Sequence, residues 1–87
     1  MEYNVIFKSE KLIHKDLSKI PLSDRKKIFS VLKDMKNLSN MKFNVKQLKN
    51  YYLCDYRIRV WNYRILFDIR DDNTIVVYRI LHRSKLY

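Results

Sequence analysis

The hydrophobic and polar positions of this 87-residue chain follow first a strand period and then a helical one. Residues 2–7 alternate and are rich in strand-forming types, which predicts a β-strand. The next apolar residues recur at helical spacing in two stripes. The first stripe is Leu12, Ile13, Leu17 and Ile20, and the second is Ile28, Val31, Leu32, Met35 and Leu38. The two stripes predict an αα-hairpin joined by the short connection at residues 20–23.

Residues with capping chemistry mark the ends of both predicted helices. Ser9 is a suitable N-cap for the first helix, and Pro21 ends it. Ser23 or Asp24 can cap the second helix, because both side chains accept hydrogen bonds from free backbone N–H groups. The polar, turn-prone stretch at residues 37–44 favours a loop.

Alternating residues in the second half of the chain predict three antiparallel strands. They span residues 54–60, 63–69 and 74–81. Two-residue turns at residues 61–62 and 72–73 would join them, the second because Asn and Asp tolerate positive φ best after glycine. Residues 45–53 fit either a last turn of helix or the lead into a strand. The element order is then β-α-α-β-β-β, an α+β fold with a two-helix hairpin on one face of a small, mainly antiparallel twisted sheet.

These registers assign each strand residue to one of two sheet faces. The helix-covered face would carry Tyr56, Ile58, Val60, Tyr63, Ile65, Phe67, Ile69, Val76, Tyr78 and Ile80. The open face would carry Arg57, Arg59, Arg64, Leu66, Asp68, Val77, Arg79 and Leu81. Facing like charges destabilise a sheet by about 0.2–1 kcal/mol per pair. A pair between Asp68 and one arginine, best Arg79, would offset only about 0–1 kcal/mol of this repulsion.

An open face with four arginines favours a phosphate-binding site. The planar guanidinium suits bidentate phosphate contacts and stays charged at physiological pH. The chain has 19 Lys and Arg against 9 Asp and Glu, a net charge of +10. Such a field favours nucleic acid, an anionic membrane or an acidic protein as partner. The alternatives are a solvated face on which the arginines splay apart, and a generally lysine-rich surface.

Composition limits the other kinds of chemistry. At this length residues 1–87 form a single domain. The absence of glycine excludes Gly-rich phosphate loops. The apolar runs are far shorter than the ~20 residues of a spanning helix, and the N-terminus does not resemble a signal peptide, so a cytoplasmic protein without a membrane partner is expected. Cys54 is expected to be a packed thiol rather than a nucleophile. One cysteine and two histidines form no metal-ligand spacing, so no metal or cofactor is expected.

The second half of the chain resembles a known family. "VKQLKN", followed by "YRIRVWNYRILFDIRDDNTIVVYRILHRSKLY", resembles the RelE/ParE toxin superfamily of bacterial and archaeal type II toxin–antitoxin systems. The usual pattern there reads "vkkLkg–YRiRvGdYRiiyei–d–ivvlrighR––vY". The N-terminal half agrees with the family in element order. The resemblance implies three partners: a cognate antitoxin encoded by a neighbouring gene, the ribosome, and mRNA. It also implies that the toxin is monomeric when alone.

The resemblance also implies an activity and the residues for it. RelE-type members are ribosome-dependent endoribonucleases that use no metal. The 2′-hydroxyl of the mRNA attacks the neighbouring phosphate and leaves a 2′,3′-cyclic phosphate. The residues expected to be catalytic are those at the positions of the family's functional residues, together with a histidine that some branches use. They are Arg59, Arg64, His82, Arg83 and Tyr87. The residues expected to bind RNA are Arg57, Arg79, Lys46, Lys49 and Trp61.

Two departures from the family pattern affect this assignment. Trp61 replaces the turn glycine, and Trp is poor at positive φ, so a turn wider than two residues, which would alter the arginine register, stays an alternative. The basic pair is arginine where RelE-type enzymes carry lysine. Arginine, with a pKa above about 12, is a poor general base, which shifts proton transfer toward His82 or Tyr87. The alternatives are a ParE-like toxin, a branch that inhibits DNA gyrase without nuclease activity, and a non-toxic basic nucleic-acid-binding domain.

Overall fold

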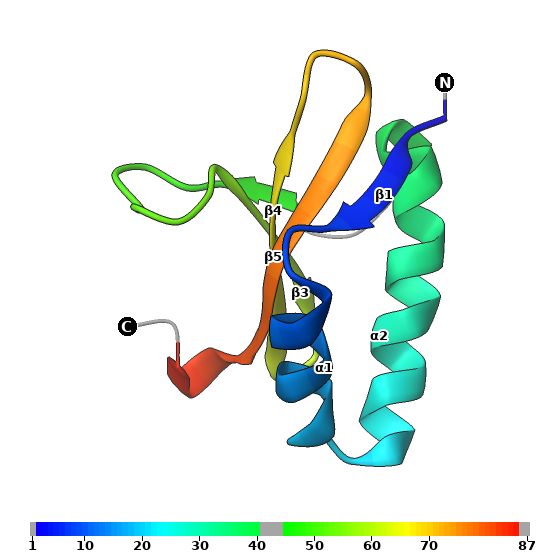
Figure 1. Ribbon diagram of the computed structural model, residues 1–87, viewed down its shortest axis with the longest axis vertical. Coiled ribbons are helices and arrows are strands. Elements are labelled where there is room, and N and C mark those ends of the chain that lie inside the picture. Colours follow the sequence, from blue (N-terminus) through cyan, green and yellow to red (C-terminus); the bar gives the residue numbers. More distant parts are fainter. Residues whose placement is uncertain (1, 41–44, 86–87) are drawn as a thin grey trace.

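The computed structural model describes residues 2–40 and 45–85, and its helices form one layer on a mixed five-stranded sheet. The helices are α1 (Glu10–Ser18) and α2 (Leu22–Asp34). The strands are β1 (Asn4–Phe7), β2 (Val45–Gln47), β3 (Tyr56–Val60), β4 (Tyr63–Ile69) and β5 (Thr74–His82). The sheet order is β1-β5-β4-β3-β2, with β1 parallel to β5 and the other neighbours antiparallel. Figure 1 shows the helical hairpin on one side of the sheet, which confirms the predicted α+β fold.

The start of each helix depends on a different kind of cap. The Ser9 hydroxyl accepts a hydrogen bond from the Leu12 N–H at 3.3 Å, which confirms the predicted N-cap of α1. The predicted caps of α2, Ser23 and Asp24, lie inside that helix, and this prediction was wrong. Pro21 is the N-cap instead, and its carbonyl accepts from the Asp24 N–H at 3.0 Å. The fixed φ of proline, here −57°, makes it a suitable residue at a helix start.

The connection between α2 and the antiparallel strands is more structured than predicted. Residues Met35–Asn40 form short 3₁₀ turns on either side of a kink at Asn37 (φ −113°, ψ 51°), where the sequence favoured a loop from residue 37. The rest of that predicted loop, residues 41–44, lies outside the described residues. The ambiguous segment that follows contains the short strand β2, which pairs antiparallel with β3. Within the described residues, no helix is long and apolar enough to cross a membrane.

The hydrophobic core lies between the helices and the sheet. The helical layer contributes Ile13, Leu17, Ile20, Ile28, Val31, Leu32 and Met35. The sheet contributes Ile58, Val60, Tyr63, Ile65, Phe67, Ile75, Val77 and Ile80. Each such side chain contributes about 1.5–3 kcal/mol when it is fully buried. The opposite face is less open than predicted, because Leu66 and Val76 on it are also buried.

The turn between β4 and β5 differs from the prediction. The Arg70 N–H donates to the Thr74 carbonyl at 2.8 Å, and the Asn73 N–H donates to the Arg70 carbonyl at 3.1 Å. Three residues, 71–73, therefore form the loop, and the predicted two-residue turn at Asp72-Asn73 was wrong. Asn73 adopts the positive φ, 61°, that such a loop requires.

The extra turn residue changes which β5 side chains enter the core. Ile75 and Val77 face the helices, whereas the prediction placed Val76 and Tyr78 there. A one-residue change of register moves every side chain to the opposite face. A β-bulge leaves Tyr78 without a cross-strand partner and restores the predicted register beyond it. Ile80 therefore enters the core as predicted.

Candidate nucleic-acid interface

Three arginines lie together on the sheet face that points away from the helices. In β3, Arg57 and Arg59 alternate with the buried Ile58 and Val60, so their side chains project from the opposite face. Arg64 of β4 lies directly opposite Arg59, which confirms the predicted pair. Lys46 of β2 lies opposite Arg57. We call Lys46, Arg57, Arg59 and Arg64 the arginine face.

The β3–β4 turn positions Arg64. Its Nη1 donates to the carbonyls of Trp61 at 3.1 Å and Tyr63 at 2.9 Å. Val60 pairs with Tyr63, so the turn has two residues, and the wider turn considered from the sequence is not found. Trp61 adopts φ 54°, a conformation that costs a non-glycine residue about 1–2 kcal/mol.

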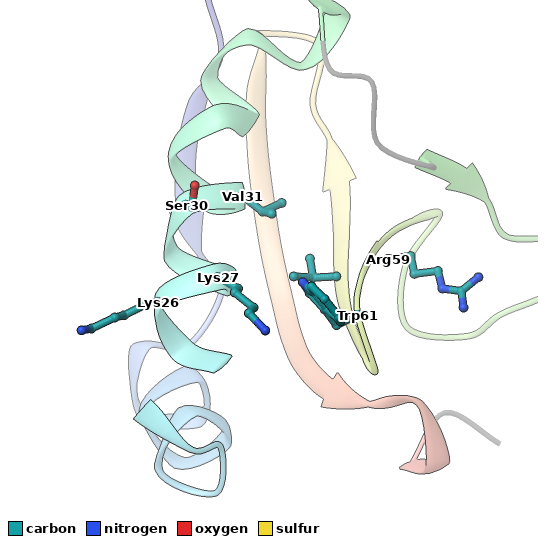
Figure 2. A pocket seen from close by; sticks show the side chains of 7 residues that line it. Lys26, Lys27, Ser30, Val31, Arg59 and Trp61 are labelled. Atoms are coloured by element: carbon teal, nitrogen blue, oxygen red, sulfur yellow. The ribbon is translucent and has the colours of Figure 1, made fainter. Parts of the chain in front are cut away.

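The β3 arginines are available for a ligand. Within residues 2–40 and 45–85, the guanidiniums of Arg57 and Arg59 make no hydrogen bond or ion pair. Figure 2 shows Arg59 extending away from α2. Directly opposite residues of an antiparallel pair have Cβ atoms only about 4.5–5.5 Å apart. A phosphate between Arg59 and Arg64 would therefore replace a repulsive contact with two attractive ones.

Arg79, the fourth predicted arginine of this face, is bound to a helix. Its Nε and Nη2 donate to the two carboxylate oxygens of Asp16 at 2.8 and 2.7 Å. The same carboxylate accepts from the Ile80 N–H at 3.1 Å. Asp16 is almost completely buried on α1, and its hydrogen bond raises the pKa of Arg79. The Asp16 carboxylate thus ties α1 to the part of β5 that lies beyond its pairing with β1.

The predicted pair between Asp68 and Arg79 was wrong. The Asp68 carboxylate accepts from the Asp55 backbone N–H at 2.6 Å. Burial and the nearby Asp68 carboxylate raise the pKa of Tyr78. Asp68 therefore anchors the end of the loop that precedes β3.

His82 lies on the helix side of the sheet, away from the arginine face. It follows Ile80 by two residues, and its ring meets the ring of Tyr63 edge-on, with centroids 5.5 Å apart. Its Nδ1 accepts from the Ser84 N–H at 3.2 Å and lies 2.9 Å from the Ser84 hydroxyl oxygen. The neutral ring therefore carries its proton on Nε2. His82, which the resemblance implies as a catalytic residue, therefore lies on the other side of the sheet from Arg59 and Arg64.

The other predicted residues occupy the periphery. Arg83 is exposed and begins the 3₁₀ helix Arg83–Lys85, and its N–H donates to the Asn62 carbonyl of the β3–β4 turn at 2.7 Å. This bond places the Arg83 backbone beside the turn that positions Arg64. Lys49 is exposed in the loop after β2. Tyr87 lies outside the described residues.

A groove of about 680 Å³ lies between α2 and the end of β3 (Figure 2). It is lined by Lys26, Lys27, Ser30, Val31, Arg59, Val60 and Trp61. Lys27 Nζ lies 3.9 Å from the centroid of the Trp61 ring, which is 68% exposed. The ring therefore contacts a side chain of α2, and Lys26 and Lys27 add positive charge to this groove beside Arg59. The sequence did not single out the two lysines, because nothing in it indicated that α2 lies beside this turn.

Cys54 is a packed thiol, as expected. It is buried, and its Sγ lies 3.4 Å from the Tyr56 carbonyl, which accepts its hydrogen bond. Burial raises the pKa of Cys54 from 9.0 to about 11. In the described part of the chain, no three His, Cys, Asp or Glu side chains come together as metal ligands.

Comparisons with known proteins agree with this architecture. Residues 9–87 match the family model described as the ParE toxin of type II toxin–antitoxin system, parDE. Toxin RelE3 of Methanocaldococcus jannaschii is 40% identical over 76 residues, 84% of either chain. A chain in the crystal structure of the RelB–RelE antitoxin–toxin complex from Methanococcus jannaschii is 36% identical, with 94% of each chain covered and a TM-score of 0.74.

A more distant structure shares the fold. A chain of the archaeal RelE–RelB complex from Pyrococcus horikoshii is 21% identical, with 98% of this chain and 99% of that chain covered and a TM-score of 0.74. The family model covers nearly the whole chain, and the fold agrees with that of the archaeal toxins. The chain therefore belongs to the ParE toxin family of type II toxin–antitoxin systems, within the RelE/ParE superfamily.

Proposed function

We propose that this toxin is an endoribonuclease that cuts mRNA on the ribosome, with the scissile phosphate bound on the arginine face. The observation that carries the proposal is the cross-strand pair of Arg59 and Arg64, with Arg57 beside it. Toxin RelE3, 40% identical over 76 residues, supports the RelE-like reading of this face. No metal or cofactor takes part in the proposed step.

In the proposed reaction, the 2′-oxygen of a ribose attacks the adjacent phosphorus and the bond to the 5′-oxygen breaks. The products are a 2′,3′-cyclic phosphate and a free 5′-hydroxyl. The phosphate carries an additional negative charge in the transition state, and fixed cations aimed at that charge usually give the largest stabilisation. Arg64 is held by the turn carbonyls, and we propose that Arg59, opposite it, and Arg83, which follows β5, supply the other two cations.

The proton steps need a different group, because arginine holds its proton too tightly. We propose Tyr87 as the first candidate, on the family match alone. His82 is the second candidate, and two observations weigh against it. Its ring lies on the helix side of the sheet, and protonation of Nδ1 would break the bond from Ser84 N–H. Tyr87→Phe and His82→Ala distinguish the two candidates. Replacement of the residue that moves the proton should lower the cleavage rate by about 10²–10⁴-fold.

A cognate antitoxin is the expected partner, since relatives crystallise as RelB–RelE complexes. We propose that a small acidic protein encoded beside this gene neutralises the toxin by covering its basic surface. Tagged toxin co-expressed with that neighbour should purify as a stable complex. If the neighbour's product does not bind and does not relieve toxicity, this part of the proposal is wrong.

The ParE description of the matching family supports one rival, a gyrase-directed toxin without nuclease activity. The test is induction of the chain in a sensitive host, followed by mapping of mRNA ends and an assay of plasmid supercoiling. The proposal expects new mRNA ends within codons and unchanged supercoiling. Toxicity with intact mRNA and lost supercoiling would assign the chain to the gyrase-directed class.

A further inference from the structure

The loop between β2 and β3 is long for a hairpin connection and carries two adjacent tyrosines. It comprises residues 48–55, whereas hairpin loops usually have about 2–5 residues. Its ends are fixed, because the Leu48 N–H donates to the Asp55 carbonyl at 2.7 Å. Asn50, at φ 59°, turns the chain directly before Tyr51 and Tyr52. Long ordered loops of this kind are commonly functional.

The loop lies on the same side of the sheet as the arginine face. The Asp55 backbone N–H donates to the Asp68 carboxylate, and the place of Asp68 in β4 puts it on the face of Arg64. Burial raises the pKa of Tyr51, and the positive charge of Arg79 partly opposes that shift. Figure 1 shows the loop projecting from the sheet away from α2.

The two tyrosines differ in exposure, so that one ring can support the other while the outer ring is free to stack on a ligand. Tyr51 is half-buried, whereas Tyr52 is 91% exposed. Their ring centroids lie 5.3 Å apart, so Tyr51 supports Tyr52 from one side. A ring so exposed gains almost nothing from folding, because the hydrophobic contribution depends on the area removed from water. Lys46 and Lys49, both exposed, lie on β2 and in the loop beside it.

We propose that Tyr51 and Tyr52 form a stacking site for a base of the single-stranded RNA whose phosphates lie on the arginine face. This inference rests on the proposed function and adds a subsite to it. Proteins that bind single strands combine a basic track for the backbone with aromatic rings for the bases. The arginine face supplies the track, and the tyrosine pair supplies the ring on the same side of the sheet. Stacking tolerates every base, so the subsite adds affinity and position rather than sequence preference.

The test measures binding of a fluorescent 2′-O-methyl oligoribonucleotide, which lacks a free 2′-hydroxyl and therefore is not cut. Tyr52→Ala should weaken binding about 5- to 100-fold, while Tyr52→Phe should retain it. The salt dependence should be the same for wild type and Tyr52→Ala, because no phosphate contact is lost. On a strand of the same length without bases, Tyr52→Ala should bind as the wild type does. Phe29→Ala, which removes a 48%-exposed ring from α2, is the matched control and should change nothing.

The stacking site is overturned if Tyr52→Ala binds the oligoribonucleotide as tightly as the wild type does while Arg59→Ala binds it more weakly. That outcome leaves the proposed function intact. Should neither the wild type nor any variant bind RNA, the stacking site fails, whereas cleavage of ribosome-bound mRNA tests the ribonuclease proposal separately. Loss of antitoxin binding in Tyr52→Ala, without any change in RNA binding, would make the loop a protein contact and would also overturn the inference. Thermal melting should show that Tyr52→Ala folds, since its side chain is exposed.

Discussion

At the scale of single residues, the Asp16–Arg79 pair shows how a charge with a predicted binding role serves the fold. Strand alternation placed Arg79 on the open face, and its pairing with Leu66 agrees. Its partner was not predictable, because β1 pairs with β5 only as far as Val77. The uncovered edge beyond Val77 leaves the Ile80 N–H free for a helix carboxylate, and no local pattern in the sequence indicates this.

Asp16→Asn should destabilise the protein. The substitution removes the charge that three hydrogen bonds contact and leaves a partly buried guanidinium without its carboxylate. The free energy of unfolding in urea should fall by about 2–3 kcal/mol. Asp71→Asn, in the exposed β4–β5 loop, is the control and should stay within about 0.5 kcal/mol of the wild type. Equal urea midpoints for the two variants would contradict the structural role of Asp16.

Cys54 should be inert to thiol reagents in the folded protein. Reaction requires the thiolate, and burial raises the pKa of Cys54 from 9.0 to about 11. Below pH 9 this shift alone lowers the thiolate fraction roughly 100-fold, and burial slows access further. The raised pKa favours the folded state while the thiol is protonated, and this contribution disappears as the pH rises from 9.0 to about 11. The rate of Cys54 labelling at pH 8 should be measured for the native protein and for the protein unfolded in urea. Native protein that is labelled as fast as unfolded protein would show that Cys54 is not inert.

At the scale of elements, the two hairpins of the antiparallel sheet were predictable to different degrees. Alternation on both sides of residues 61–62 gave the correct β3–β4 register, and therefore the Arg59–Arg64 pair. In the β4–β5 hairpin, the polar residues 71–73 are compatible with a two-residue or a three-residue loop. The sequence favoured the two-residue turn, whereas the structure has the three-residue loop. The bulge at Tyr78 compensates for the extra residue. Its position depends on packing against the helices, which alternation does not report.

Trp61 in the β3–β4 turn should be dispensable for stability. Its φ of 54° is costly for Trp and tolerated by Asn, while its contact with Lys27 contributes about 0.5–1 kcal/mol at an exposed site. Trp61→Asn should therefore change the free energy of unfolding by less than about 1 kcal/mol. RNA affinity should fall if the ring is a ligand contact, as the sequence suggested. A large loss of stability would show instead that Trp61 is a structural residue of the turn.

At the scale of the whole molecule, binding of RNA should depend strongly on salt. Arg57, Arg59, Arg64 and Arg83 would give four phosphate contacts. Each contact with a single strand contributes a log–log salt slope of about −0.7, or roughly −3 for the four. Arg59→Ala should make the slope shallower by about one contact. Arg70→Ala removes an exposed arginine from the opposite end of β4 and should leave the slope unchanged. Equal slopes for both variants would move the RNA path off the arginine face.

The central claim is that the Arg59–Arg64 pair stabilises the transition state of mRNA cleavage. The most direct test is the single-turnover rate of cleavage of ribosome-bound mRNA at saturating toxin, with the product ends identified. Arg64→Ala should lower this rate by about 10²–10³-fold, the usual effect of removing one oriented donor. Arg70→Ala, with the same loss of charge, should cleave at the wild-type rate and leave 2′,3′-cyclic phosphate ends. Wild-type cleavage by Arg64→Ala, or an equal loss of rate in Arg70→Ala, would contradict the claim.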